Sequence, residues 1–157
     1  MDYMIRAIDK KKTFRLFMVR STKTVEEARK HHNTTPTASA ALGRVLTAGL
    51  MMGYMMKNEK DRLTITIDGG GPIGKILVVS DNSGNVKGYV DNPNVNLKLK
   101  KNGKLDVGGA VGTKGKLTVM TDIGMKEPYV GSTDLVTGEI GEDIAYYYYL
   151  SEQQNTA

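Results

Sequence analysis

The sequence contains no cysteine at any of its 157 positions. This absence excludes disulfide bonds, a thiolate nucleophile and any cysteine-based zinc site within these residues, and it fits a reducing compartment. Histidine is scarce as well, because only His31 and His32 are present. Adjacent side chains on a short helix diverge by about 100°, so these two histidines cannot by themselves coordinate the same metal ion. We predict no metal-binding residues and no cofactor in this chain.

No catalytic constellation can be assembled either. His31 and His32 come before all of the residues that they would have to act on in catalysis, and the sequence has no serine–histidine–aspartate order. The carboxylates that could act as acids or bases lie at expected turns or strand ends, where such groups are usually solvated. They are Asp106, Asp122, Glu127 and Asp134. We therefore predict that the protein is not an enzyme and has no catalytic or cofactor-binding residues.

One glycine-rich segment comes close to a phosphate-binding loop. Residues 69–75, GGGPIGK, match the first seven positions of G-x-x-x-x-G-K-[ST], but Ile76 stands where a magnesium-binding hydroxyl is needed. Pro72 removes one N–H from the cradle, and the apolar residues that follow read as a strand and not as a helix. We predict a turn between strands. An enzyme acting on a phosphorylated ligand through this loop is the third functional hypothesis.

The charge balance is mildly basic, because 22 lysines and arginines oppose 17 aspartates and glutamates. Many of the lysines fall in residues 10–12, 98–104 and 114–116, and such scattered charge is typical of a solvated surface. We expect no specific nucleic-acid partner. The second functional hypothesis is nevertheless a basic nucleic-acid or ribosome-associated binding module, since the basic pI and the lysine-bearing strands suit a polyanion.

The longest apolar stretch is TPTASAALGRVLTAGLMMGYMMK, residues 35–57. Thr35 can cap a helix and Pro36 suits its first position, so a helix over about 36–57 is predicted. Its apolar side chains point in every direction and leave no polar face for water, which indicates burial on all sides. Glycines within it lower helix propensity by up to about 1 kcal/mol each, which indicates that other elements pack closely against them.

Lipid or protein could surround such a helix. The stretch is about long enough to cross a bilayer, but Thr37, Arg44 and Thr47 interrupt it and no signal-like apolar segment opens the sequence. We predict a central helix enclosed by β-sheet and no membrane partner. Arg44 shares a stripe with Thr37, Ala40 and Thr47, where it needs a carboxylate or carbonyl partner.

The remainder of the sequence predicts strands and two shorter helices in a single α+β domain. Thr24 and Glu27 have the spacing of a capping box, which predicts a helix over about 25–32. Acidic residues from Glu139 onward predict a last helix over about 140–152. Residues 102–116 hold five glycines and are predicted to be a long connection without regular structure. Alternation predicts a hairpin over 3–8 and 13–21, and strands over 63–67, 75–80, 86–90, 95–100, 117–121 and 129–136.

Adaptable apolar side chains are concentrated in two places. Met51, Met52, Met55 and Met56 lie near the end of the central helix, and four tyrosines occupy residues 146–149 of the last helix. Flexible or amphipathic groups of this kind occur at promiscuous binding surfaces. Methionines on a central helix equally suit a core, so both interpretations stay open.

Four separated blocks of the sequence resemble the heat shock protein 33 family of redox-regulated chaperones. The similarity runs in the same order from residue 1 to about 153. Gly108 and Gly109 stand where that family commonly has basic residues, so the resemblance carries over no role for that charge. The blocks are PTASAALGR at 36–44, GGGPIG at 69–74, GKLDV with AVG within 103–112, and TGEIGEDIAYYYYLSEQ at 137–153.

The resemblance implies that residues 1–157 correspond to an N-terminal client-binding and dimerisation domain, with two β-sheets packed around the buried helix. It implies a cytoplasmic bacterial holdase that binds unfolding proteins under oxidative and heat stress without ATP. In the family, a linker and a C-terminal zinc domain with four cysteines follow; both are absent from this sequence. The cysteine–zinc redox switch therefore cannot operate in this chain, and we expect a sheet face to be left open.

Overall fold

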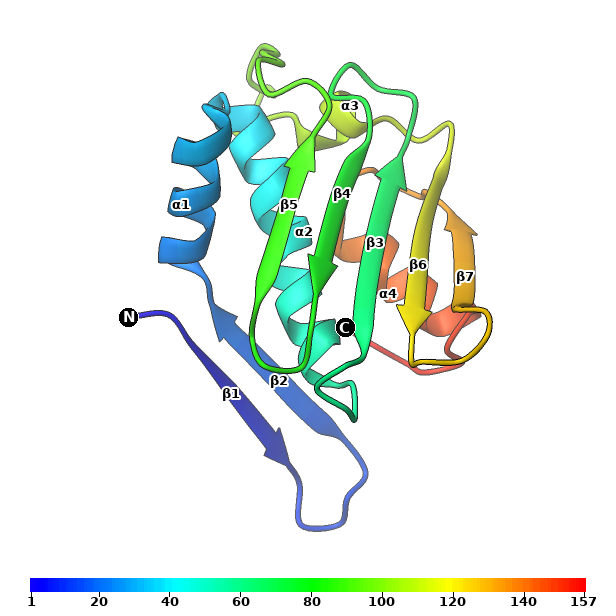
Figure 1. Ribbon diagram of the computed structural model, residues 1–157. Helices are drawn as coiled ribbons and strands as arrows, with labels where there is room; N and C mark the ends of the chain where they lie inside the picture. The colour runs from blue at the N-terminus through cyan, green and yellow to red at the C-terminus, as the bar shows by residue number, and fades with distance from the viewer.

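The computed structural model describes all of residues 1–157 as an α+β fold with two antiparallel sheets (Figure 1). The helices are α1 (Thr22–His32), α2 (Pro36–Tyr54), α3 (Val107–Val111) and α4 (Gly141–Leu150). The strands are β1 (Tyr3–Ile8), β2 (Arg15–Arg20), β3 (Arg62–Asp68), β4 (Ile76–Ser80), β5 (Val86–Val90), β6 (Lys116–Asp122) and β7 (Tyr129–Asp134).

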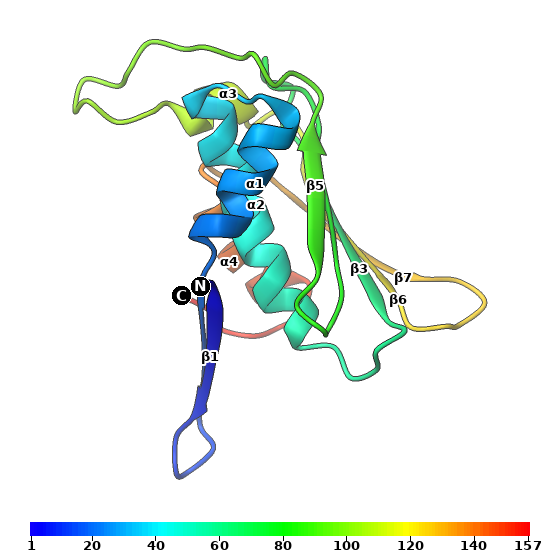
Figure 2. The same cartoon turned by 60° about the vertical axis from the view of Figure 1, so that its left-hand side comes forward.

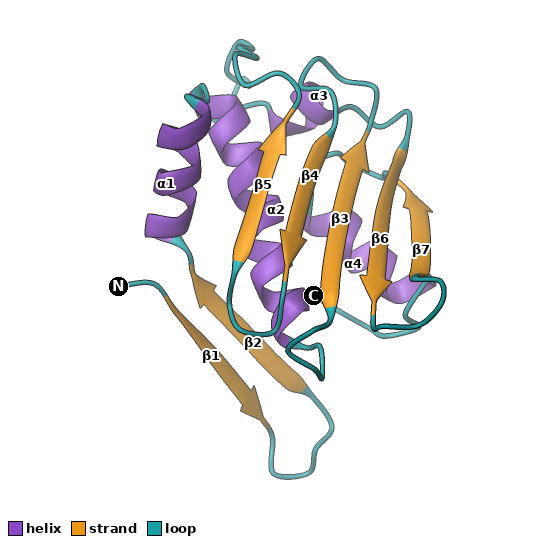
Figure 3. Cartoon of the chain, viewed as in Figure 1, coloured by secondary structure: helices purple, strands orange, loops and turns teal.

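The larger sheet has five strands in the order β5-β4-β3-β6-β7, and every neighbouring pair is antiparallel. Strict alternation in β3 sends Leu63, Ile65 and Ile67 into the core, while Thr64 and Thr66 lie on the opposite face. All four helices lie on one side of this sheet, and its other side carries no helix (Figures 2 and 3). The core therefore sits between the sheet and α2.

Helix α2 begins where its sequence predicts. The Thr35 hydroxyl accepts a hydrogen bond from the Ala38 N–H at 3.5 Å, and Pro36 occupies the first turn. Close packing explains two of its glycines, because a Cβ on Gly49 would approach Val78 to 2.8 Å and one on Gly53 would approach the Asp81 carbonyl to 2.6 Å. The predicted central helix between two sheets is confirmed: α2 contacts the five-stranded sheet and also β2.

Arg44 binds both a carboxylate and a carbonyl, the two kinds of partner predicted for it. Its guanidinium donates to the Glu139 carboxylate at 2.7 Å and to the Glu139 carbonyl at 3.0 Å. Lys100 also pairs with the Glu139 carboxylate, and the Gly108 N–H donates to it at 3.1 Å. One carboxylate thus joins α2, the segment before α3 and the approach to α4.

The start of α4 is built around a buried carboxylate. Asp143 accepts hydrogen bonds from the N–H groups of Val136, Thr137 and Ile140 at 2.7 to 2.9 Å. Ile140 has φ 76°, a left-handed conformation that β-branched residues rarely adopt, and its side chain is fully buried. The bonds to Asp143 and the burial of Ile140 together stabilise this turn.

The smaller sheet is the β1–β2 hairpin, which projects from the body of the molecule (Figure 1). Its turn is organised by Asp9, whose carboxylate accepts from the N–H groups of Lys11, Thr13 and Phe14. Near its base, the Ser21 hydroxyl bonds to Thr47 of α2 at 2.7 Å, and Arg6 lies 5.6 Å from the ring centroid of Tyr54.

Three local predictions are wrong. Residues 95–100 form no strand and join neither sheet; instead the Val95 carbonyl accepts from the Thr35 hydroxyl. The segment predicted to be irregular contains α3, whose first turn is capped by Asp106 through the Gly109 N–H at 2.9 Å. Thr24 does not begin α1, since the helix starts at Thr22 and the Thr24 hydroxyl donates to Asp2.

The bounds of the other helices differ by a few residues from those predicted. Helix α2 ends at Tyr54 and not at residue 57, because the N–H groups of Met55 and Met56 already make shorter turns back to Met52 and Gly53. Helix α4 covers Gly141–Leu150 within the predicted 140–152.

Candidate functional site

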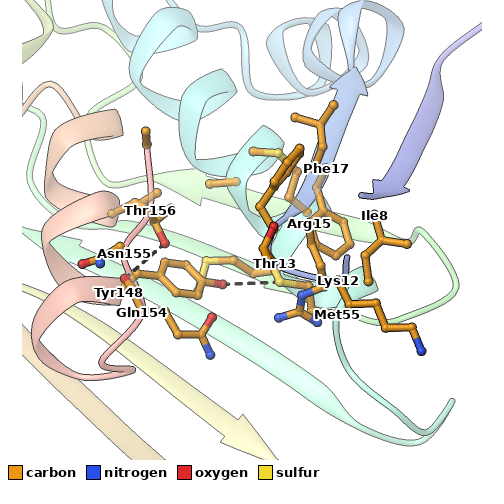
Figure 4. Close-up of a pocket in the computed structure, with 17 residues that line it drawn as sticks. Ile8, Lys12, Thr13, Arg15, Phe17, Met55, Tyr148, Gln154, Asn155 and Thr156 are labelled. Carbon is orange, nitrogen blue, oxygen red and sulfur yellow. Dashed lines mark hydrogen bonds between the residues drawn. The ribbon is translucent and has the colours of Figure 1, made fainter. Parts of the chain in front are cut away.

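An apolar groove of about 730 Å³ lies between the β1–β2 hairpin and the body of the molecule (Figure 4). Four segments far apart in sequence form its walls: the hairpin, the second half of α2, α4 and residues 154–157. Most of the lining side chains are apolar. They include Phe17 of β2, Met51 and Met52 of α2, Met55 directly after α2, and Ile144 and Tyr148 of α4.

The methionines and tyrosines singled out from the sequence divide between core and groove. Met52 is buried, whereas Met51 and Met55 are half-buried in the groove wall. Tyr147 is buried in the core and its hydroxyl donates to Glu152 at 2.9 Å. Tyr148 faces the groove, so each of the two open interpretations holds for part of the set.

Tyr148 provides a polar tip inside the apolar wall. Its hydroxyl lies 3.9 Å from the Met55 sulfur, and Figure 4 shows it reaching across the groove toward the hairpin. Burial raises the pKa of Tyr148 to about 12, so the phenol stays neutral at physiological pH. Methionine and tyrosine together give this wall a shape that can adapt to different apolar groups.

Two cations stand on the hairpin side of the groove. Lys12 comes from the hairpin turn and Arg15 from the start of β2, and both side chains are exposed (Figure 4). The Arg15 guanidinium lies 5.9 Å from the ring centroid of Phe17. Neither cation takes part in an ion pair. The groove therefore combines an apolar floor with an uncompensated positive rim.

The outward face of the hairpin adds exposed apolar surface beside the groove. Alternation places Tyr3 and Ile5 of β1 and Met18 of β2 on that face together with Leu16, which also lines the groove, and each is between 44% and 51% exposed. The hairpin is a two-stranded sheet, so the outer backbone edges of both strands have no strand partner. Unpaired edges of this kind are templates for further pairing.

A second open surface is the helix-free face of the five-stranded sheet. Leu77 and Val79 are half-buried there, and Tyr89, Met120 and Val130 are exposed. Threonines and charged side chains separate these apolar groups. This face is more mixed in polarity than the groove, and like the groove it is open to solvent.

The glycine-rich turn does not present a phosphate cradle. The Gly71 N–H donates to the Val111 carbonyl at 2.9 Å, and the Ile73 N–H donates to the Ala110 carbonyl at 3.1 Å. These N–H groups are therefore occupied by α3, and the segment connects β3 to β4, as predicted. A Cβ on Gly71 would collide with the backbone of α3, which explains why glycine stands there.

The other candidate positions do not form a site. His31 and His32 lie on α1 with their rings 5.1 Å apart, and nowhere do three or more histidine, aspartate or glutamate side chains come together as metal ligands would. The lysines of residues 10–12 and 98–104 lie at opposite ends of the molecule (Figure 1), so they make no continuous basic patch. None of the helices combines the length and apolarity required to span a bilayer.

Sequence reasoning missed the hairpin wall of the groove. Phe17, Arg15 and Lys12 read as ordinary strand and turn residues, and only the topology brings them opposite α2 and α4. The sequence nevertheless shows that this segment is strongly basic, because residues 3–20 contain six cations and a single acid, Asp9.

Comparison with known proteins identifies one family. The family described as "Hsp33 protein" matches residues 2–157. The 33 kDa chaperonin of Thermoanaerobacter sp. strain X514 is 57% identical over 99% of this chain, which covers 53% of that relative. The 33 kDa chaperonin of Clostridioides difficile strain 630 is 53% identical over 97% of this chain, which covers 52% of that relative. The chain thus spans about half the length of the curated relatives it matches.

A solved structure agrees with the fold. The crystal structure of the 33 kDa chaperonin (heat shock protein 33 homolog) from Thermotoga maritima superposes with a TM-score of 0.90 at 41% sequence identity. The match covers 94% of this chain and 50% of that one.

Proposed function

This chain belongs to the Hsp33 family of chaperones, and we propose that it is an ATP-independent holdase that binds unfolding proteins at the groove and the adjoining hairpin face. The observation that carries the proposal is the groove itself, because its apolar walls are built from methionine and aromatic side chains and stay open to solvent. Capture of unfolding chains requires exposed apolar area of adaptable shape and no catalytic geometry.

Neither nucleotide nor redox chemistry enters this proposed activity. The N–H groups that a phosphate would need are bonded to α3. The chain has no cysteine, so its residues do not fit a thiolate zinc site, and binding by this chain is constitutive in the proposal. The absence of cysteine also suits the reducing cytoplasm, where we place the protein under heat and oxidative stress.

The partners in this proposal are unfolding proteins and a second copy of the chain. A two-stranded hairpin with an apolar outward face and free edges can pair with either one. Light scattering of the purified chain from micromolar concentration upward measures self-association, and added unfolding protein would compete with it.

The test is suppression of aggregation of a chemically unfolding protein, without nucleotide, under reducing and under oxidising conditions. We expect suppression of similar strength in both. A double change of Ile8→Ser and Phe14→Ser, at side chains 56% and 65% exposed, should at least halve suppression and leave the fold intact. Met125→Ser, at a side chain 69% exposed and outside the groove, is the matched control and should change nothing.

Two results would contradict the proposal. The first is a requirement for oxidation, reduction or ATP. The second is equal loss of suppression in the groove variant and in the Met125 control, which would mean that the groove has no special role.

A further inference from the structure

We propose that the groove selects polypeptide segments in which a large apolar side chain is flanked by aspartate or glutamate. This inference rests on the proposed holdase function and names the class of segment that it binds. Apolar area alone would accept any hydrophobic segment. The charged side chains that line this groove, Lys12 and Arg15, are both positive, and that asymmetry distinguishes among segments.

The hairpin carries a large excess of positive charge. Residues 3–20 hold six cations and one acid, and none of the six takes part in an ion pair. The single acid, Asp9, is occupied, because its carboxylate accepts hydrogen bonds from three N–H groups and a hydroxyl of its own turn. The one carboxylate of the hairpin is thus held within its own turn and forms no ion pair with any of the six cations.

Only two of the six cations line the groove, and they are Lys12 and Arg15. The planar guanidinium of Arg15 beside Phe17 can bind a carboxylate with two parallel hydrogen bonds while the apolar neighbour of that carboxylate enters the groove. Glu152 lies near Tyr148, where its carboxylate accepts from the Tyr147 hydroxyl at 2.9 Å, and it forms no ion pair with Lys12 or Arg15. The positive charge at the rim thus remains available to a ligand.

The size of the groove and the state of the hairpin favour a polypeptide as the occupant. A volume of about 730 Å³ holds a few large side chains and not a folded domain. The outer edges of β1 and β2 offer backbone groups without strand partners, and an extended polypeptide can satisfy them by adding as a further strand. A fatty acid could match the apolar wall and the cations, but it has no backbone for those edges.

The experiment uses three fluorescent peptides of one length with the same phenylalanine and leucine anchors, flanked by glutamate, glutamine or lysine. Binding to the full chain is measured by anisotropy at low and at high salt. We expect the glutamate peptide to bind about tenfold more tightly than the glutamine peptide, which is the effect of one charge-assisted contact, and the lysine peptide to bind most weakly. High salt should reduce the differences.

Variants assign the preference to the groove. Lys12→Gln with Arg15→Gln should bring the glutamate and glutamine peptides within about twofold of each other, while Arg15→Lys keeps part of the preference because it keeps the charge. The matched control, Lys10→Gln with Arg20→Gln, removes the same net charge from hairpin positions outside the groove and should keep the full preference. All of these side chains are exposed, and an unchanged melting temperature verifies folding.

Three outcomes would overturn the inference. They are equal affinity for the three peptides, equal loss of preference in the control, and displacement of the bound peptide by dodecanoate at comparable concentration, which would identify the groove as a fatty-acid site. These failures are separate from failure of the proposed function. Equal peptide affinities with intact suppression of aggregation remove only the selectivity, whereas absence of suppression removes the holdase proposal itself.

Discussion

The two sheets of this protein have the same alternating sequence pattern, but the apolar side chains are buried in one sheet and exposed in the other. In β3 the apolar residues of the alternation, Leu63, Ile65 and Ile67, are at most 5% exposed because α2 and its neighbours cover that face. In the hairpin the same alternation leaves Ile5 45% exposed and Met18 51% exposed. Alternation therefore fixes which side chains share a face, and the presence of a second layer decides whether that face becomes core or binding surface.

The difference extends to stability. The five-stranded sheet contributes to one continuous core with α2, α3 and α4, whereas a two-stranded hairpin is marginal by itself in water. The Asp9 turn stabilises the hairpin internally, and the bond between Ser21 and Thr47 fixes its base to α2. We call the five-stranded sheet with α2, α3 and α4 the packed side, and the β1–β2 hairpin the hairpin side. We infer that the packed side provides the free energy of folding and that the hairpin side is available for binding.

The largest expected effect tests this division with one matched pair of substitutions. Ile65→Ala in β3 should lower the free energy of unfolding by about 3 to 4 kcal/mol, since it opens a cavity at a fully buried position. Ile5→Ala in β1 removes the same atoms from an exposed face and should cost less than about 1 kcal/mol. Urea unfolding followed by circular dichroism measures both. Equal costs would mean that the hairpin is part of the cooperative core.

A somewhat smaller effect is expected at the start of α4, which closes the packed side. Asp143→Ala leaves three N–H groups without their acceptor in a buried turn, so we expect a loss of about 2 to 3 kcal/mol in the same unfolding experiment. Glu142→Ala, in the same helical turn but exposed, is the control and should cost only a few tenths of a kcal/mol. A comparable loss in both variants would assign the effect to helix charge and not to the buried bonds.

The sequence predicted the packed side better than the hairpin side. Thr35 and Pro36 mark the start of α2 through local chemistry, and the all-round apolar pattern after them requires burial, so this element could be predicted without knowing its neighbours. The same pattern required a partner for Arg44 but could not identify Glu139, which lies 95 residues further along the chain.

The wrong predictions arose where long-range contacts decide the local structure. Residues 95–100 alternate as a strand would, but they join neither sheet. Helix α3 contains two adjacent glycines and is a weak helix by propensity. It forms because Asp106 caps it, Val107 and Ala110 are buried, and the glycine-rich turn donates hydrogen bonds to its last carbonyls. The cap is local, but the burial and the hydrogen bonds from the glycine-rich turn come from distant segments and cannot be read from a pattern.

The candidate site was only half predictable for the same reason. Met51, Met55 and Tyr148 could be singled out by residue type, because flexible and amphipathic side chains are unusual in such numbers. Arg15 and Phe17 could not, since their importance comes from the placement of the hairpin opposite α2 and α4.

The smallest predicted effect concerns the ionic junction on the packed side, and it depends on pH. Burial by itself would raise the pKa of Glu139, but hydrogen bonds from Lys100, Arg44 and the Gly108 N–H outweigh it and lower the pKa to about 2. A lowered carboxyl pKa stabilises the fold fully above the unfolded value of 4.5, and this stabilisation is lost as pH falls from 4.5 toward 2.

Glu139→Gln removes the charge that makes this contribution. We expect the variant to lose about 1 to 2 kcal/mol of unfolding free energy at pH 7, because its side chain is partly screened by solvent, and almost nothing relative to the parent at pH 2. Glu127→Gln, at an exposed carboxylate without hydrogen bonds, should follow the parent at every pH. Urea midpoints measured from pH 7 down to pH 2 decide the point. If the parent and the Glu139 variant stay parallel across this range, the junction contributes no net charge-dependent stability, and packing alone holds the segment before α3 against α2.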